Sequence, residues 1–229
     1  MEEVLERLAN AIIDGEPELA EAAAKEALAA GIPPLEIIER GANRGIQEIG
    51  ERFSRYDCFL PELILAGDAM NAALPVLLAS LSAAEAKSLR LGKVVIATVT
   101  GDIHDIGKNI VAALLTVAGF EVFDLGVNVD VKQILRKADE VKADIIALST
   151  LLSTSLPYQK DVVRYLQDSG KRERYFVVVG GGPVAPDWAQ QIGADGYGRT
   201  AAHAVELCKQ LMAQYEPPMR EPLVFDYKA

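Results

Sequence analysis

The sequence predicts an α/β protein in which an N-terminal four-helix bundle is followed by a doubly wound parallel sheet. This prediction rests on a change of hydrophobic periodicity near residue 92. Before that point, apolar residues recur every three or four positions, as on one face of a helix; after it, short β-branched runs alternate with helical segments. Half of the 229 residues are hydrophobic, which excludes a largely disordered chain.

Residues 1–82 are expected to form the helical region. The expected helices lie around residues 5–12, 19–28, 34–53 and 60–81. The breaks at residues 15–17 and 31–34 each pair a glycine with a proline that can occupy the first turn of the next helix. Pro75 is expected to kink the last helix or to end its regular part. Four short helices with brief turns indicate a bundle.

Residues 83–92 are small and charged, which predicts a linker that could act as a hinge. Beyond it, strands are expected at 94–99, 120–125, 145–148 and 176–179, and helices at about 107–118, 130–141, 157–169 and 199–214. This alternation predicts an α/β domain over residues 93–215, with ligands at the carboxyl ends of its strands. The tail, residues 216–229, is expected to pack over the body, the alternative being a partner interface.

Composition excludes several classes of function. A formal charge of −10 and a pI near 4.8 disfavour nucleic acid and anionic membranes as partners. Cys58 and Cys208 are far apart in the sequence, which disfavours a disulfide framework and fits a reducing cytosol. The acidic start is unlike a secretory signal, and no uninterrupted apolar stretch spans a bilayer. We therefore expect a cytoplasmic protein.

Three loops that follow predicted strands carry the candidate functional residues. They are Asp102-Ile103-His104-Asp105-Ile106-Gly107, the hydroxyl-rich segment 149–155, and Gly180-Gly181-Gly182-Pro183. A neutral imidazole ligates transition metals, and a carboxylate two residues earlier can fix its tautomer. Each loop alone could be an ordinary turn. In a doubly wound sheet, however, all three meet at one edge, where they would offer a histidine ligand, a polar slot and a surface free of side chains.

The three loops resemble a known family. Asp102, His104 and Gly107, then Ser149 and Leu151, then Gly180 and Gly181, are similar to the D-x-H-x-x-G…S-x-L…G-G signature of cobalamin-binding domains. The segment 52–63 with Ala69-Met70 is similar to the helical cap of methyl-transferring corrinoid proteins. Residues 1–215 are thus covered, and segments 187–189 and 192–198 look most like the corrinoid subunits of methylamine-type systems.

This resemblance implies a role for each matching residue. His104 would be the lower axial ligand of the cobalt of a cobalamin or related corrinoid, Asp102 would bond its other ring nitrogen, and Ser155 would continue that relay. The cofactor's own base would enter the domain beside Ser149 and Ser153. Gly180 and Gly181 would leave room for the nucleotide tail. The remaining expected cofactor contacts are Ile103, Asp105, Ile106, Gly107 and Leu151 in the loops, and Phe59 and Met70 as shields from the bundle.

The implied function is that of a methyl-carrier subunit rather than a complete enzyme. A substrate-specific methyltransferase would place a methyl group on Co(I), and a second methyltransferase would pass it from methyl-Co(III) to a thiol or folate-type acceptor. A reductive activase would restore the active cofactor. Methylated amines are the preferred donors, methanol or methoxylated aromatics the next. The alternatives are the small subunit of a carbon-skeleton mutase, a cobalamin-based sensor, and a flavodoxin-like signalling domain without cobalamin.

Overall fold

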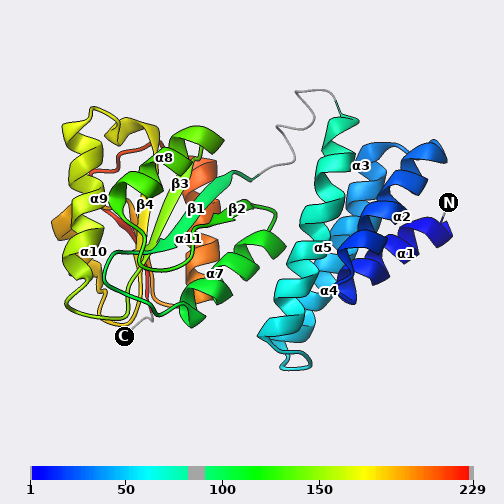
Figure 1. Cartoon of the computed structure of the whole chain (residues 1–229), viewed down its shortest axis with the longest axis horizontal. Coiled ribbons are helices and arrows are strands. Elements are labelled where there is room, and N and C mark those ends of the chain that lie inside the picture. Colours follow the sequence, from blue (N-terminus) through cyan, green and yellow to red (C-terminus); the bar gives the residue numbers. More distant parts are fainter. Residues whose placement is uncertain (1, 82–90, 227–229) are drawn as a thin grey trace. The chain divides into compact units, whose positions relative to one another are not determined.

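The computed structural model describes residues 2–81 and 91–226, which belong to two compact units, Met1–Leu89 and Arg90–Ala229 (Figure 1). Most of the expected linker, residues 83–92, lies outside the described residues. Between residues 2 and 81, the described part of the first unit, the regular elements are all helices. Its elements are α1 (Glu2–Ile13), α2 (Pro17–Ala29), α3 (Pro34–Ile37), a π-helical segment (Ile38–Ala42), α4 (Asn43–Ser54) and α5 (Leu60–Ala79).

The helical unit follows the predicted four helices, with two local differences. The third predicted helix extends from Pro34 to Ser54 without a turn, but its hydrogen bonding changes to the π-helical pattern between Ile38 and Ala42. Pro75 lies inside α5, and the helix continues for another turn to Ala79. Leu77 and Leu78 in that turn are buried. Their burial offsets the backbone hydrogen bond that a proline cannot donate.

Helix α5 is a core helix of the bundle. By length and composition it is apolar enough to cross a membrane, with a mean hydropathy of 1.4. However, Leu63, Ala66 and Ala69 are fully buried, and 44% of the most apolar stretch of the helix is buried inside the protein. The start of α5 is held by Glu62, whose carboxylate accepts the backbone N–H of Phe59. One mostly apolar helix of this kind is normal for a globular bundle.

The second unit is a six-stranded, wholly parallel sheet in the order β2-β1-β3-β4-β5-β6. The strands are β1 (Lys93–Thr98), β2 (Glu121–Asp124), β3 (Ile145–Ser149), β4 (Phe176–Gly180), β5 (Gly196–Gly198) and β6 (Leu223–Phe225). Because β2 lies on one side of β1 and β3 on the other, the direction of winding reverses there. The predicted doubly wound α/β fold is therefore confirmed.

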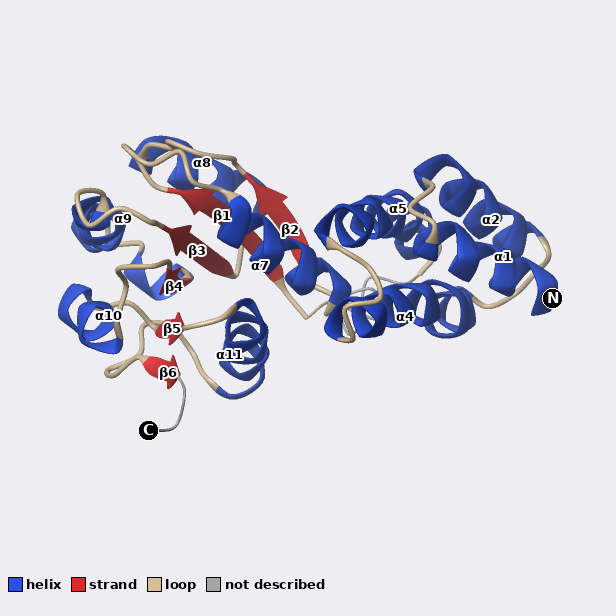
Figure 2. Ribbon diagram, turned by 90° about the horizontal axis from the view of Figure 1, so that it is seen from below, coloured by secondary structure: helices blue, strands red, loops and turns tan. Residues whose placement is uncertain are grey.

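Alternation of side chains along the strands creates two hydrophobic cores, one on each face of the sheet. In β1, Val95 and Ala97 face the core covered by α8, α9 and α10, whereas Val94 and Ile96 face the core covered by α7 and α11 (Figure 2). The helices are α7 (Ile106–Val117), α8 (Val131–Val141), α9 (Leu156–Asp168), α10 (Pro186–Ile192) and α11 (Ala201–Gln214). The sheet is buried on both faces.

Two strands and a helix were not among the predicted elements. Strand β5 is the sequence Gly-Tyr-Gly, which has no apolar run to reveal it. Strand β6 lies in the C-terminal tail and pairs with β5 at the edge of the sheet, so the tail does pack on the body, as a strand. Helix α10 is seven residues long, too short to show a clear period.

Candidate functional site

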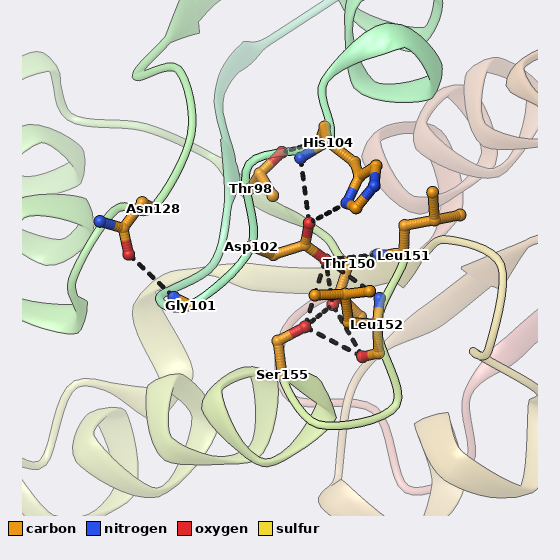
Figure 3. Close-up of polar contacts among 9 residues, drawn as sticks. All are labelled: Thr98, Gly101, Asp102, His104, Asn128, Thr150, Leu151, Leu152 and Ser155. Carbon is orange, nitrogen blue, oxygen red and sulfur yellow. Dashed lines mark hydrogen bonds and ion pairs between the residues drawn. The ribbon is translucent and has the colours of Figure 1, made fainter.

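The three predicted loops meet at the carboxyl edge of the sheet. They leave β1, β3 and β4, which are neighbours in the sheet, so the loops after them are brought side by side. Figure 3 shows Asp102 and His104 from the first loop beside Thr150, Leu151, Leu152 and Ser155 from the second. Residues separated by about fifty positions in the chain thus share one hydrogen-bond network.

Asp102 and His104 form the pair that their spacing predicts. One carboxylate oxygen of Asp102, Oδ1, lies 2.7 Å from His104 Nδ1 and accepts the backbone N–H of His104 at 3.0 Å. The two bonds fix both the ring and the chain at this residue. The carbonyl of His104 accepts a hydrogen bond from the hydroxyl of Thr98 at 2.9 Å, which ties the loop to the end of β1.

The other carboxylate oxygen of Asp102 is surrounded by donors from the loop after β3. Oδ2 accepts the backbone N–H groups of Leu151 at 2.6 Å and Leu152 at 3.1 Å. The hydroxyl oxygens of Thr150 and Ser155 lie 2.8 Å and 3.2 Å from the same oxygen, within hydrogen-bond distance. The carboxyl group is fully buried. A buried charge is stable only when it is well hydrogen-bonded, and this one is.

These contacts keep Asp102 ionised. Burial by itself would raise the pKa of this carboxyl group. The hydrogen bonds from the backbone and ring of His104, the backbone of Leu151 and the hydroxyl of Thr150 oppose burial, and together they hold the pKa well below its usual range. Asp102 is therefore a carboxylate throughout the physiological pH range, and it accepts a hydrogen bond from Nδ1–H of His104.

His104 presents its second ring nitrogen outward. With Nδ1–H given to Asp102, the neutral ring leaves the lone pair of Nε2 for a metal. The side chain is 47% exposed, so the ring is accessible even though its partner is buried. Ile103 and Ile106, on either side of it, are 74% and 72% exposed. Exposed apolar side chains beside a ligand are suited to a large apolar surface lying over the loop.

A cavity of about 650 Å³ opens beside His104 and runs down between the sheet and helices α7 and α11. Its lining includes Ile96, Ala147 and Val178, which are register partners across the middle of β1, β3 and β4. Val111 of α7 and Leu207 of α11 line its sides. Polar residues enter from the loops. The cavity is thus polar and open at the sheet edge and apolar within.

The glycines after β4 permit close approach of backbone segments. Gly181 has φ +121°, and a side-chain carbon there would lie 1.7 Å from the carbonyl oxygen of Thr150. A carbon at Gly182 would meet the side chain of Leu151 at 2.8 Å. A side chain at Gly181 would push the backbone of the loop after β3 away from Asp102, whereas one at Gly182 would only displace the side chain of Leu151. By contrast, a carbon at Gly107 would meet nothing within 4 Å, so that glycine is not required by packing.

Most of the site residues expected from the sequence come together. Nine line the cavity: Ile103, His104, Asp105, Ile106, Gly107, Ser149, Leu151, Gly180 and Gly181. Asp102 and Ser155 lie buried in the network beside it. Ser153 is exposed and is not among the lining residues. Phe59 and Met70 belong to the helical unit, where Phe59 is 71% exposed and Met70 is buried. Their predicted contact with a cofactor stays a prediction.

The sequence did not single out Thr150 or the two backbone donors. Thr150 is fully buried and contacts both Asp102 and Ser155. It lies in the hydroxyl-rich segment 149–155, but that segment has five hydroxyl residues and the sequence spacing alone does not distinguish among them. The N–H groups of Leu151 and Leu152 carry no sequence signal, because every residue other than proline has one.

Comparison with known proteins agrees with this site. The B12 binding domain family matches residues 92–206, and a second B12 binding domain family matches residues 4–78. The trimethylamine corrinoid protein 1 of Methanosarcina acetivorans is 44% identical over 211 residues, 92% of this chain and 98% of that protein. The dimethylamine corrinoid protein 1 of the same organism is 43% identical over 212 residues, 93% of this chain and 99% of that protein.

Among solved structures, the methanol:cobalamin methyltransferase complex of Methanosarcina barkeri contains a similar chain. It has a TM-score of 0.78 and 28% sequence identity, and the match covers 93% of this chain and 81% of that one. Fold, cavity and histidine together define a cobalamin-binding protein. More narrowly, the chain belongs to the family of corrinoid proteins represented by the trimethylamine and dimethylamine corrinoid proteins, and its cofactor is a corrinoid.

Proposed function

We propose that this protein is a methyl carrier that receives a methyl group from a partner methyltransferase acting on a methylated amine and delivers it to a second methyltransferase. The observation that carries the proposal is the placement of His104. Its Nδ1 is held at 2.7 Å by a fully buried carboxylate, while Nε2 is left for a ligand beside a cavity of about 650 Å³. The preferred donor follows the names of the two relatives described above.

The residues present fit a corrinoid. When bound, the corrinoid supplies the cobalt that takes up and releases the methyl group. His104 would hold this metal through Nε2, and Asp102 would keep the imidazole in the tautomer that can ligate. The exposed side chains of Ile103 and Ile106 would lie against the ring system, and the slot lined by Ile96 and Ala147 would exclude water from an inserted apolar group.

With a corrinoid bound, His104 would be able to ligate the metal and to leave it, and the hydrogen-bond network would suit such a residue. On release the imidazole can take up a proton, and the ionised Asp102 at 2.7 Å would stabilise the resulting charge. Thr150 and Ser155 spread that charge over two hydroxyls. We propose that the protein does this in the cytoplasm with three partners: a methylamine methyltransferase, a second methyltransferase that uses a thiol or folate-type acceptor, and a reductive activase.

Reconstitution with hydroxocobalamin tests the site. The full chain should become coloured and show the visible spectrum of a histidine-ligated cobalamin. His104→Ala should still bind cofactor through the cavity but lose the histidine-ligated spectrum. The matched control is His203→Ala, which removes the only other histidine and should leave the spectrum unchanged. A His104→Ala protein with the wild-type spectrum would remove His104 from the metal.

Single-turnover methyl transfer tests the carrier role. The reduced, cobalamin-loaded protein is mixed, in separate reactions, with one methyl donor and the methyltransferase specific for that donor. The donors are trimethylamine, dimethylamine, monomethylamine and methanol. We expect methylation of the cofactor with an amine and transfer onward when a thiol-directed methyltransferase is added. Methylation by methanol alone, in the presence of the methanol enzyme, would assign a different donor. A protein that binds cobalamin normally but is methylated by none of these systems would refute the carrier role.

A further inference from the structure

We propose that Thr150, rather than Ser155 directly, is the hydroxyl that positions the Asp102 carboxylate beneath His104. Thr150 would be a positioning residue: it acts on the metal ligand through Asp102. This inference rests on the proposed cofactor role of His104. It adds a residue to the site that the sequence motif leaves out.

Distances separate the two hydroxyls. Thr150 Oγ1 lies 2.8 Å from Asp102 Oδ2, whereas Ser155 Oγ lies 3.2 Å from the same oxygen. Ser155 Oγ lies closer to the carbonyl oxygen of Leu152, at 2.9 Å, than Thr150 Oγ1 does, at 3.3 Å. The hydroxyls also hydrogen-bond each other. All three side chains, Asp102, Thr150 and Ser155, are buried.

The number of available hydrogens indicates which hydroxyl donates to Asp102. Each hydroxyl has a single hydrogen, and Asp102, as a carboxylate, has none to give. The bond between the two hydroxyls needs one of these hydrogens. If Ser155 donates to Thr150, the hydrogen of Thr150 is left for Asp102 at the shorter distance of 2.8 Å. The reverse order would leave Asp102 with the 3.2 Å bond from Ser155. If the hydrogen of Ser155 goes instead to the carbonyl of Leu152, at 2.9 Å, the hydrogen of Thr150 is again left for Asp102. Thr150 is therefore the direct hydroxyl donor to Asp102, and Ser155 reaches Asp102 through Thr150.

The backbone of Thr150 is also held by the glycine loop. Its N–H donates to the carbonyl of Gly180 at 3.2 Å, and its carbonyl occupies the space where a side chain at Gly181 would lie. Thr150 is therefore a junction of all three loops. Thr150 belongs to the loop after β3. Its side chain contacts the loop after β1, and its backbone lies against the loop after β4. No other hydroxyl in the segment 149–155 has contacts of this kind among the hydrogen bonds of the described residues.

Removing the Thr150 hydroxyl should strengthen the binding of His104 to the metal. Asp102 would lose its best side-chain donor other than His104 and would accept more strongly from His104 Nδ1. A stronger bond there makes the imidazole a better metal ligand. In Thr150→Val, which keeps the shape of the side chain, the ratio of histidine-ligated to histidine-free cobalamin should rise roughly threefold to tenfold, the equivalent of one hydrogen bond. The reduction potential of the bound cobalamin should become more negative.

The test compares variants of the full chain loaded with cobalamin, with no methyl donor present. Visible spectra at fixed pH give the ratio, and spectroelectrochemistry gives the potential. Thr150→Ser restores the hydroxyl and should return both values to those of the wild type. Ser155→Ala should shift them in the same direction but less. Ser153→Ala, an exposed hydroxyl of the same loop, is the matched control and should change neither.

Two results would overturn the inference: wild-type values in Thr150→Val, or a shift in Ser155→Ala equal to or larger than that in Thr150→Val. If Thr150→Val does not fold, Thr150→Ala takes its place, and failure of Thr150→Ser to match the wild type then counts against the inference. These readouts need no methyl transfer. A protein that shows the Thr150 effect but carries no methyl group would refute the proposed function alone, and one that carries methyl without the Thr150 effect would refute this inference alone.

Discussion

Asp102 is the residue on which the site is organised. It is fully buried and accepts hydrogen bonds at both oxygens, from the backbone and ring of its own loop and from the backbone and hydroxyls of the loop after β3. Such a carboxylate does more than orient His104. It joins two loops that come from neighbouring strands, so stability of the loops and orientation of the ligand depend on one side chain.

Asp102→Asn should therefore destabilise the protein as well as disturb the ligand. An amide places an NH₂ group where one carboxylate oxygen now accepts several N–H or O–H donors, which leaves buried donors unsatisfied at a cost of about 1–3 kcal/mol. If the NH₂ faces His104, it donates to Nδ1 and moves the ring proton to Nε2, which then cannot ligate. We expect a lower free energy of unfolding in urea and a weakened histidine-ligated cobalamin spectrum.

The pH dependence of stability gives an independent check on the same residue. Because the pKa of Asp102 is lower in the folded protein than in the unfolded chain, its stabilising contribution is complete above the unfolded value and is lost as the pH falls below about 4. In Asp102→Asn this component should be absent, so the stability curves of variant and wild type should converge on acidification. If the stability curves of variant and wild type stayed parallel, Asp102 would not be the carboxylate whose protonation lowers the stability of the folded protein.

At the residue scale, the sequence predicts contacts between residues that are close together in the chain. Asp102 and His104 are two positions apart, and their pairing follows from that spacing. Ser155 was placed in the relay by resemblance, and its hydroxyl does lie 3.2 Å from Asp102. Thr150 was missed because contacts between loops about fifty residues apart depend on strand register, which spacing does not encode. Ser153 is exposed, and its predicted contact with the base of the cofactor stays a prediction.

The glycines show how whole elements, rather than single side chains, form the site. The β4 loop can pass beneath Thr150 only because Gly181 has no side chain and adopts φ +121°. Gly181→Ala should displace the β3 loop, lower the melting temperature and weaken cobalamin binding at least tenfold. Gly107→Ala is the matched control. It lies in α7 with open space around it, so it should fold normally. If Gly107→Ala binds cobalamin poorly although it folds normally, a bound cofactor needs that space.

Strand β6 makes the C-terminal tail part of the α/β unit. Leu223 and Phe225 pack on the core beneath α11, the strand pairs with β5, and the backbone N–H of Met219 donates to the buried Asp195 at 2.7 Å. A chain ending at residue 215 should lose on the order of 3 kcal/mol of stability. Thermal unfolding measures this, and removal of residues 227–229 alone is the control. An unchanged melting temperature would instead favour the alternative role of the tail, as a partner interface.

At the element scale, the four longer strands and four of the five α-helices described in this unit could be predicted, because each has a clear apolar run or period. Strand β5 could not, since the Gly-Tyr-Gly sequence is a strand only because β4 and β6 flank it. Its glycines are also explained by packing: a side-chain carbon at Gly198 would lie 2.8 Å from the backbone of Ala204 in α11. Tertiary context, not propensity, determines this part of the sheet.

At the scale of the whole molecule, the two units have separate hydrophobic cores. Both clusters of the α/β unit consist of residues between Val94 and Phe225, and the cavity beside His104 is lined by residues of that unit alone. The helical unit buries its own apolar residues, such as Leu8, Ile12 and Leu63. The two clusters of the α/β unit consist of its own residues, which is the condition for that part of the chain to fold independently.

A fragment of residues 91–229 should therefore fold alone and bind cobalamin through His104. It keeps β6, which a fragment ending at residue 215 would lose. If the helical unit shields the cofactor, as the sequence predicts, the fragment should lose methyl from bound methylcobalamin faster in light and should oxidise faster in air after reduction. Phe59→Ala in the full chain should show a milder effect. Tyr56→Ala, which removes a neighbouring aromatic that is 89% exposed, is its control. Equal photolysis and oxidation rates in fragment and full chain would rule out shielding and assign the helical unit to the docking of partner enzymes.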